Sequence, residues 1–211
     1  MSIGEFIESK KTIFWDFDGV VKDSVDAKKN AYVSIFGQIS SEHKEKIVNH
    51  HTKNGGVSRY VKIPLYLEIV GLATNQSNVD IFLERFATLV KNRVICSPWV
   101  PGVYDFIENY CKHKSNILTT ATPYDEIVEI LDELSINLFF EEIHGAPVSK
   151  TSAIKQRIIS KSLLDEDCIM IGDSSSDLQA AVDCGIDFAL RKTGYNADLI
   201  DKSTYSFEDF L

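Results

Sequence analysis

One short stretch near the N-terminus constrains the fold more than any other, because a buried strand there leads directly into two carboxylates. Residues 13–15 (Ile-Phe-Trp) are apolar on both faces, as strands inside a parallel sheet are. Asp16 and Asp18 follow, and Gly19 comes at once after them. Open α/β sheets bind ligands at the C-terminal ends of their strands, so this position suits a functional site. A strand that ends in a solvated acidic turn would show the same pattern.

The spacing of the two carboxylates has a chemical consequence. Two carboxylates one residue apart repel each other, so one of them tends to have a raised pKa unless a cation offsets the charge. Asp16 and Asp18 therefore suit a site that needs one ionised nucleophile or metal ligand and one proton carrier.

Composition limits the classes of protein that need to be considered. The chain has 211 residues, 44% of them hydrophobic, enough for one compact domain or a core with a modest insertion. A net charge of −9 argues against nucleic acid or membrane partners, although a local cation or metal could hold a small anionic substrate. The four cysteines are scattered, and no signal peptide or membrane span is evident. We expect a soluble cytoplasmic protein, either a monomer or a small homo-oligomer.

Residues 25–95 carry a helical pattern throughout and contain no run typical of a buried strand. Apolar residues at helical spacing predict helices over 25–36 and 41–51, and a further helix from Ser77. This region therefore differs from the strand that precedes it and is expected to fold as a separate helical unit.

Two details inside the helical region carry further expectations. Ser58 is a typical N-cap and predicts another helix, while Pro64 lies inside that helix and predicts a kink or a restart. His50 and His51 are adjacent, and neighbours in a helix face different directions, so a shared metal site is not expected. We assign both histidines to the polar surface.

Beyond residue 96 strands and helices alternate. Thr122 is expected to cap a helix whose first residue is Pro123. The expected strands of the whole chain are 13–15, 116–120, 139–144, 168–171 and 188–190, with an edge strand at 205–207, and the later helices are 101–114, 151–161 and 175–184. Such alternation predicts an α/β fold with a doubly wound parallel sheet, similar to a Rossmann fold. The core would be 1–24 and 96–211, with an α-helical cap domain, 25–95, inserted after the first strand.

Three later strands also end in polar residues that could contribute to one site. A hydroxyl with free N–H groups at a helix start can bind an anion or simply cap the helix. A lone lysine between a strand and a helix can be a ligand or a solvated loop residue, and two aspartates four apart can bind a metal or cap a helix. The residues concerned are Thr120 with Ala121, Lys150, and Asp173 with Ser174 and Asp177.

Taken in order, these strand ends resemble a known superfamily. The succession DxDGV, Thr, Lys and GDSxxD resembles the haloacid dehalogenase superfamily of phosphohydrolases, and the helical insertion falls where that superfamily has its type 1 cap. The resemblance covers the whole chain and is closest to the phosphoglycolate phosphatase and beta-phosphoglucomutase branch. It implies that Asp16 is the nucleophile, that Asp18 is the acid/base, and that Thr120, Ala121 and Lys150 bind the phosphoryl group.

The resemblance also implies a magnesium site. Mg²⁺ would be bound by the carboxylates of Asp16 and Asp173 and by the backbone carbonyl of Asp18, with Asp177 and Ser174 around them. Hard oxygen ligands of this kind suit Mg²⁺. An anionic nucleophile that attacks an anionic phosphate also needs nearby cations, which Mg²⁺ and the lysine would supply in an acidic protein.

The helical insertion carries a second resemblance. The run 56–59 (Gly-Val-Ser-Arg) resembles the cap loop of beta-phosphoglucomutase, in which the arginine grips the far phosphate of the substrate, and here that residue is Arg59. An exposed arginine at a helix start is the alternative. The hinge histidine of that mutase is matched by Lys28, which argues against mutase activity.

The expected function is therefore a Mg²⁺-dependent phosphatase that acts on a small phosphorylated metabolite such as a sugar phosphate or phosphoglycolate. The reaction would pass through an aspartyl-phosphate. The alternatives are a phosphomutase that uses the same residues, and a non-catalytic binding protein that has kept the fold.

Overall fold

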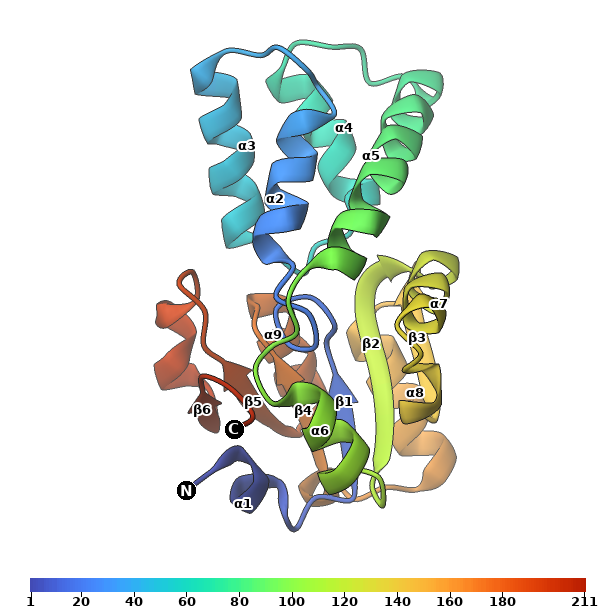
Figure 1. Ribbon diagram of the computed structural model, residues 1–211, viewed down its shortest axis with the longest axis vertical. Helices are drawn as coiled ribbons and strands as arrows, with labels where there is room; N and C mark the ends of the chain where they lie inside the picture. The colour runs from blue at the N-terminus through green and yellow to red at the C-terminus, as the bar shows by residue number, and fades with distance from the viewer.

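The computed structural model describes residues 1–211, and its centre is a six-stranded, fully parallel sheet (Figure 1). The strand order is β3-β2-β1-β4-β5-β6, so the chain builds outward on one side of β1 and then crosses back to build the other side. The strands are β1 Thr12–Trp15, β2 Ser115–Pro123, β3 Glu142–Ala146, β4 Cys168–Gly172, β5 Asp187–Arg191 and β6 Tyr205–Phe207. The predicted doubly wound α/β sheet is confirmed. Its topological switch point lies between β1 and β4, where such sheets bind ligands.

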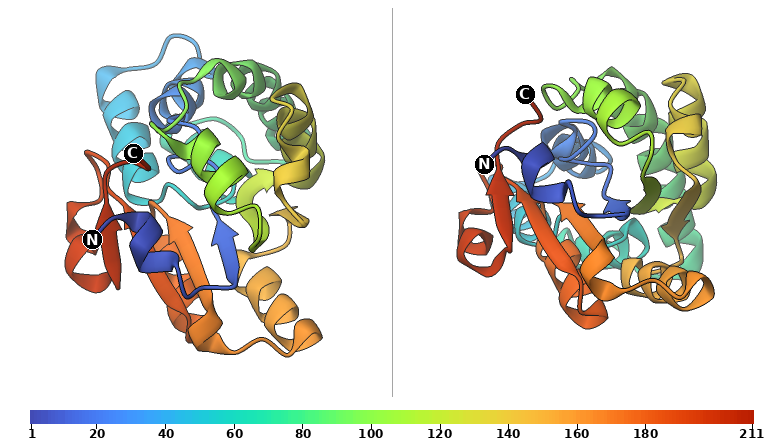
Figure 2. Two further views of the ribbon diagram at one scale, coloured as in Figure 1. Left: turned by 60° about the horizontal axis from the view of Figure 1, so that its bottom comes forward. Right: turned by 90° about the horizontal axis from the view of Figure 1, so that it is seen from below.

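Helices cover both faces of the sheet (Figure 2). Side chains alternate along a strand, so Ile13 and Trp15 face one helical layer while Phe14 faces the other, and all three are fully buried. The first layer contains α1 Ile3–Ile7, α6 Val103–Asp105 with the π-helical turn η1 Phe106–Tyr110, and α7 Tyr124–Glu133; the second contains α8 Lys150–Lys161, α9 Ser175–Cys184 and the 3-10 helix η4 Ala197–Lys202. Burial on both faces explains why β1 is a continuous apolar run.

Four further helices form a bundle beyond the C-terminal ends of the strands, at the top of Figure 1. They are α2 Val25–Ser34, α3 Ser41–Lys53, α4 Arg59–Ile69 and α5 Gln76–Cys96. Aromatic rings fill the bundle core, where Tyr32 stacks on Phe86 at 4.1 Å and meets the edge of Tyr66 at 5.2 Å between centroids. None of the helices of the chain has the length and apolarity needed to cross a membrane.

The helix that contains Pro64 does not restart as predicted. Helix α4 is continuous from Arg59 to Ile69. Ser58 caps it, with its side chain accepting a hydrogen bond from Tyr60 N at 3.4 Å. Pro64 removes one backbone donor, while the buried face on either side of it continues unchanged through the helix. Packing of that face outweighs the loss of one hydrogen bond.

Several predicted boundaries are also wrong. Strand β2 extends through Pro123, which is the N-cap of α7, so Thr122 belongs to the strand and does not cap the helix. The hydroxyl of Thr122 instead accepts a hydrogen bond from Lys28 Nζ at 2.9 Å. The strand expected at 139–144 is β3, Glu142–Ala146, and the residues before it form the 3-10 turn η2 Asn137–Phe139. A second such turn, η3 Asp165–Asp167, precedes β4.

Candidate active site

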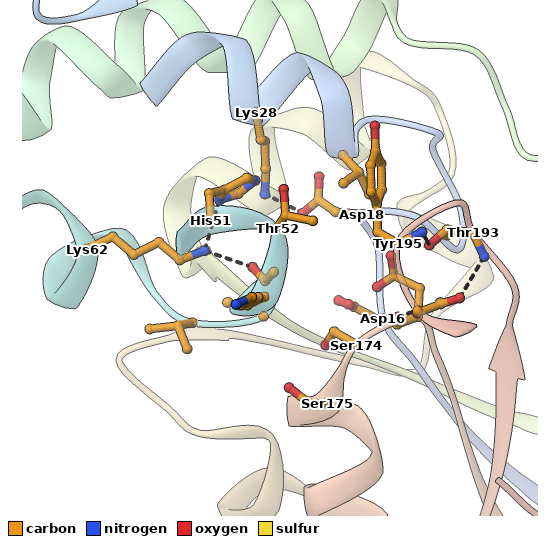
Figure 3. A pocket seen from close by; sticks show the side chains of 18 of the residues that line it. Asp16, Asp18, Lys28, His51, Thr52, Lys62, Ser174, Ser175, Thr193 and Tyr195 are labelled. Carbon is orange, nitrogen blue, oxygen red and sulfur yellow. Dashed lines mark hydrogen bonds and ion pairs between the residues drawn. The ribbon is translucent and has the colours of Figure 1, made fainter. Parts of the chain in front are cut away.

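The ends of the central strands open onto a cavity of about 660 Å³ between the sheet and the helical bundle (Figure 3). Asp16 follows β1 directly, and its backbone N–H donates to Ile171 of β4 at 2.9 Å, so its place is fixed by the sheet. Asp18, Thr120 and Asp173 line the same cavity. Ala121, Ser174 and Arg59 line it too. Residues that are far apart in the sequence therefore converge, because parallel strands end at one edge of the sheet.

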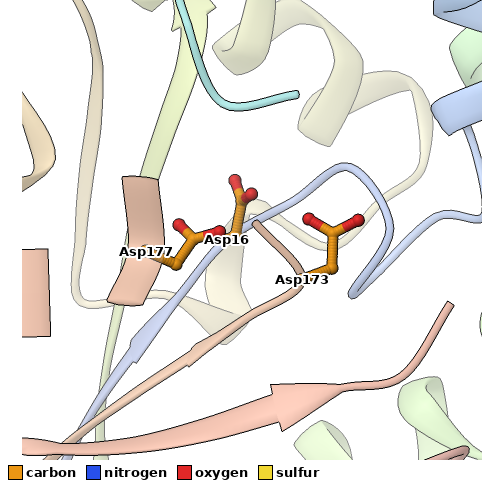
Figure 4. A group of neighbouring side chains, drawn as sticks. All are labelled: Asp16, Asp173 and Asp177. Atoms are coloured by element: carbon orange, nitrogen blue, oxygen red, sulfur yellow. The ribbon is translucent and has the colours of Figure 1, made fainter. Parts of the chain in front are cut away.

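Three carboxylates form a tight cluster (Figure 4), in which Asp16 and Asp173 line the cavity and the fully buried Asp177 lies beside them. Asp16, Asp173 and Asp177 each contribute an oxygen, and these oxygens lie within 4.8 Å of one another. Burial, together with the charges of Asp177 and Asp18, raises the pKa of Asp16 to about 7 even though Lys150 opposes the shift. Burial and the charges of Asp16 and Asp177 also raise the pKa of Asp173 well above its usual range. So much negative charge away from water calls for a cation.

Lys150 supplies part of that positive charge. It begins α8, is 8% exposed, and its Nζ lies 2.9 Å from Asp16 Oδ2 and also pairs with Asp177 Oδ1. Burial alone would lower the pKa of this amine, but the charges of the two aspartates outweigh burial and raise it. Lys150 is therefore not a solvated loop residue, and it stays charged beside the predicted nucleophile.

The loop after β4 both caps a helix and serves the cluster. Ser174 is the N-cap of α9, and its backbone N–H donates to Asp177 Oδ2 at 3.0 Å, as in a capping box. The Ser174 hydroxyl donates to the same oxygen at 2.6 Å. The other oxygen of Asp177 faces Lys150. This motif is therefore both a helix cap and a part of the ionic site.

The cluster fits a hard divalent cation such as Mg²⁺. Its donors are carboxylate oxygens on three separate positions, the ligand type that Mg²⁺ prefers. The backbone leaves room for them, because a Cβ at Gly19, where φ is +79°, would lie 2.2 Å from Asp173 Oδ2. Asn196 steadies this segment by donating to the backbone carbonyl of Asp173 at 2.7 Å. The sequence analysis predicted that Asp177 lies around the metal ligands, but its carboxylate belongs to the cluster itself.

The side chain of Asp18 is not part of the cluster and is held by residues at the start of the bundle. Ser24 Oγ donates to Asp18 Oδ1 at 2.6 Å, and Lys28 Nζ forms an ion pair with Oδ2 (Figure 3). Burial alone would raise the pKa of Asp18, but the charge and hydrogen bond of Lys28, helped by Ser24, lower it below the usual range. No sequence motif predicted these contacts, since they depend on the direction in which α2 begins after the loop that follows β1.

Thr120 and Ala121 lie at the cavity on strand β2. Thr120 is 2% exposed, and its hydroxyl accepts a hydrogen bond from Thr122 N at 3.2 Å, which fixes the direction of the side chain. The role predicted for the pair, contact with a phosphoryl group, stays a prediction.

Similarity to known proteins identifies the family of this chain. The family model for haloacid dehalogenase-like hydrolases matches residues 13–190, most of the chain. The chain belongs to the haloacid dehalogenase-like hydrolase family. Phosphoglycolate phosphatase 1 of Pseudomonas aeruginosa is 24% identical over 198 aligned residues, which cover 88% of this chain and 71% of that protein.

Solved structures of other hydrolases share the fold. A hydrolase from Pseudomonas syringae superposes with a TM-score of 0.75 at 18% identity, covering 96% of this chain and 95% of that one. A haloacid dehalogenase-like hydrolase from Streptococcus pneumoniae superposes with a TM-score of 0.72 at 20% identity, covering 96% and 95%. The chain is thus an enzyme of the hydrolase class, as the strand-end motifs predicted.

Arg59 of this hydrolase lies at the cavity, but its guanidinium is not free. Nη1 donates to Glu126 Oε2 at 2.7 Å and Nη2 to Oε1 at 2.5 Å, and the guanidinium carbon lies 4.7 Å from the centroid of the Phe86 ring. Arg59 is 5% exposed, which corrects the alternative of an exposed arginine at a helix start. The pair must open before Arg59 can grip a substrate, and that role stays a prediction.

The assignment of both histidines to the polar surface is wrong. His51 is 2% exposed and lines the cavity, and its ring lies 5.0 Å from that of Tyr32. His50 is half-buried, with Nδ1 3.1 Å from Tyr66 OH. Lys62 is 1% exposed and lines the cavity beside His51. A helical pattern alone could not show that the inner face of α3 turns toward the site.

Proposed function

We propose that this hydrolase is a Mg²⁺-dependent phosphatase that acts on a small phosphorylated metabolite through an aspartyl-phosphate on Asp16. The observation that carries the proposal is that the Asp16 carboxylate lines the cavity, lies 2.9 Å from the Lys150 ammonium and belongs to a carboxylate cluster suited to a divalent cation. The relative named phosphoglycolate phosphatase supports a phosphate monoester as substrate. Phosphoglycolate and sugar phosphates are the candidates.

The reaction would have two steps. In the first, an oxygen of Asp16 attacks phosphorus while the bond from phosphorus to the leaving oxygen breaks, and Asp18 gives that oxygen a proton. In the second, Asp18 takes a proton from a water that attacks the same phosphorus, and the bond to Asp16 breaks. Free phosphate leaves, and both aspartates return to their starting states.

The other residues would neutralise charge and orient the phosphoryl group. Lys150 already faces Asp16 at 2.9 Å, so it is placed to attract phosphoryl oxygens that approach the nucleophile. The Thr120 hydroxyl and the backbone at Ala121 would hold the same oxygens. Asp16, Asp173 and the backbone of Asp18 would hold Mg²⁺, with Asp177 beside them, and the ion would withdraw negative charge from the phosphoryl group when bound.

We assign the role of a cap to residues 25–95 and that of the catalytic core to 1–24 and 96–211. The bundle stands over the strand ends and provides one wall of the cavity, which supports exclusion of water from the reacting atoms (Figure 1). We also propose a cytoplasmic location. The four cysteines are free thiols, which supports a reducing compartment.

A direct assay tests the proposed function. The purified protein should release phosphate from an aryl phosphate in the presence of Mg²⁺ and lose this activity in EDTA. Asp16→Asn should abolish turnover because the nucleophile and a metal ligand are lost together, whereas Asp201→Asn, on the exposed η4, should keep full activity. Full activity of Asp16→Asn would exclude the covalent route. An isomeric phosphate as product, without free phosphate, would indicate a mutase.

A further inference from the structure

Lys62 is a buried cation without a carboxylate partner. It lies in the first turns of α4, is 1% exposed, and its Nζ donates to the Gly55 carbonyl at 3.1 Å and lies 3.1 Å from His51 Nδ1. No ion pair of the structure includes this lysine, and both of its polar neighbours are uncharged acceptors. A buried ammonium in such surroundings is costly unless an anion joins it.

The neighbours of Lys62 do not supply that anion. Burial, with the charges of Lys62 and Lys28, lowers the pKa of His51 to about 2, so the imidazole is neutral and its Nδ1 accepts. The Tyr32 ring, 5.5 Å from the amine, offers only its π face. Burial and the charge of Lys28 lower the pKa of Lys62 to about 7, and Asp18 only partly opposes this.

The other buried or half-buried cations that line or border the cavity already have carboxylate partners. Lys28 pairs with Asp18, Arg59 with Glu126, and Lys150 with two members of the acid cluster. Lys62 differs from them because it faces the shared cavity with its charge unmatched. Figure 3 shows it entering from the bundle side, with its amine directed toward His51.

We propose that Lys62 is a specificity-determining residue that binds a carboxylate of the substrate at the bundle end of the cavity. The inference rests on the proposed phosphatase function and names its substrate class, a phosphate monoester of a hydroxy acid. A single ammonium beside a neutral imidazole matches a compact monoanion. A second phosphate group would bring two charges and would need a further cation. The carboxylate would complete the coordination that Gly55 and His51 begin.

Matched pairs of substrates test this inference. The probes are straight-chain carboxylic acids of two to four carbons with a terminal phosphate, and the alkyl phosphates of the same length that lack the carboxylate. Kinetics with Mg²⁺ should be measured for the wild type, for Lys62→Met, which keeps the length of the side chain, and for Lys46→Met as control. Lys46 is an exposed lysine of the same bundle, paired with Glu42 on the surface.

The wild type should prefer the acid at one chain length, and Lys62→Met should lower kcat/KM for that acid by about 30-fold or more, as expected when one partner of a buried charge pair is lost. Alkyl phosphates and the control variant should change little. A wild type that shows no preference for the acid at any length overturns the inference, whatever the variant does. So does an equal loss by Lys62→Met on both members of a pair, since a lysine that only supports the fold would act in that way.

The assay separates this inference from the proposed function. Release of phosphate from an aryl phosphate without any preference for acids would leave the phosphatase intact and overturn the role of Lys62. Absence of phosphate release from every probe would overturn both. Thermal unfolding of each variant shows whether the bundle is still folded, and the preference of the wild type decides the matter even where Lys62→Met does not fold.

Discussion

In the proposed mechanism Asp18 serves two steps that need opposite protonation states. As an acid it must carry a proton to the leaving oxygen, and as a base it must accept one from water. Lys28 and Ser24 hold it in the ionised form, with a lowered pKa, in the arrangement seen here. Asp18 is therefore ready to act as the base, and the Lys28 contact must loosen before it can act as the acid.

Replacing Asp18 by Asn separates its chemistry from metal binding. The change keeps the backbone carbonyl, so Mg²⁺ affinity measured by calorimetry should survive, while turnover should fall by roughly 10²–10⁴-fold. The rate of the first step should fall less for substrates with good leaving groups, because their leaving oxygen needs less protonation. Asp23→Asn is a suitable control, since the Asp23 side chain is half-exposed. Loss of Mg²⁺ affinity in Asp18→Asn would contradict the assigned role.

Single residues also show how far the sequence could predict the site. Asp16, Thr120 and Asp173 meet because each lies at or near the C-terminal end of a parallel strand, and a parallel sheet can be inferred from the alternation of elements. Lys62 could not be placed in this way. Its position depends on the rotation of α4 within the bundle, which is set by packing of side chains from several helices and not by any local motif.

Helices α4 and α7 are joined by a buried ion pair that ties the bundle to the sheet layer. Arg59 and Glu126 form two parallel hydrogen bonds, and both side chains are largely buried. The loop before α4 adds a second contact, because a Cβ at Gly56 would lie only 1.8 Å from Ser176 Oγ at the start of α9. The bundle thus contacts the core at two places beside the cavity, and one of them is an ion pair.

The Arg59–Glu126 pair should contribute to stability and to closure. Arg59→Ala and Glu126→Ala should each cost about 3–5 kcal/mol in the free energy of unfolding, because each leaves a buried charge unpaired. The double variant should cost less than the sum of the two. Denaturant unfolding measures all three, and Glu129→Ala, which breaks the exposed pair with Lys91, should cost no more than about 1 kcal/mol.

Kinetics of the same variants distinguish this role from substrate binding. Loss of closure should lower kcat/KM by similar factors for hydroxy-acid phosphates and for alkyl phosphates. If Arg59→Ala leaves stability unchanged and affects only the acids, then Arg59 is the substrate-binding cation that the loop motif predicted.

Element boundaries were less predictable than element types. The β strands and the α-helices after residue 96 were expected in the right order, whereas α1 was not expected. The start of α7 was misplaced, because Thr122 and Pro123 have the composition of a helix start while pairing in the sheet extends β2 through both. The continuity of α4 through Pro64 has a similar cause. In each case a tertiary contact outweighed a local preference.

The whole molecule combines a strong negative charge with a concentrated acidic site. The net charge is −9, and three carboxylates, two of them buried and one half-buried, lie together at the switch point of the sheet. The raised pKa values of Asp16 and Asp173 indicate that this cluster costs stability when no cation is bound. Binding of a divalent cation should therefore act on the stability of the whole fold as well as on the reaction.

Thermal unfolding can measure that coupling without any substrate. At a Mg²⁺ concentration of about 100 times Kd, a single site adds about 2.7 kcal/mol to stability, or roughly 5–10 °C in Tm for a chain of this size. Asp173→Asn removes a charge whose carboxylate makes no hydrogen bond, so without metal it should raise Tm, and Mg²⁺ should then add little. The control Asp201→Asn should respond to Mg²⁺ like the wild type.

The raised pKa of Asp173 determines how the stability of the metal-free protein changes with pH. A carboxyl that ionises less readily in the folded protein than in the unfolded chain costs nothing below the unfolded pKa, near 4, and costs more as pH rises above it. The gain in Tm of metal-free Asp173→Asn over the wild type should therefore be small at pH 4 and grow toward pH 8. A variant that is less stable than the wild type across this range would show that repulsion from the neighbouring carboxylates does not destabilise the protein through Asp173. A variant that keeps the full response to Mg²⁺ would show that Asp173 does not hold the ion.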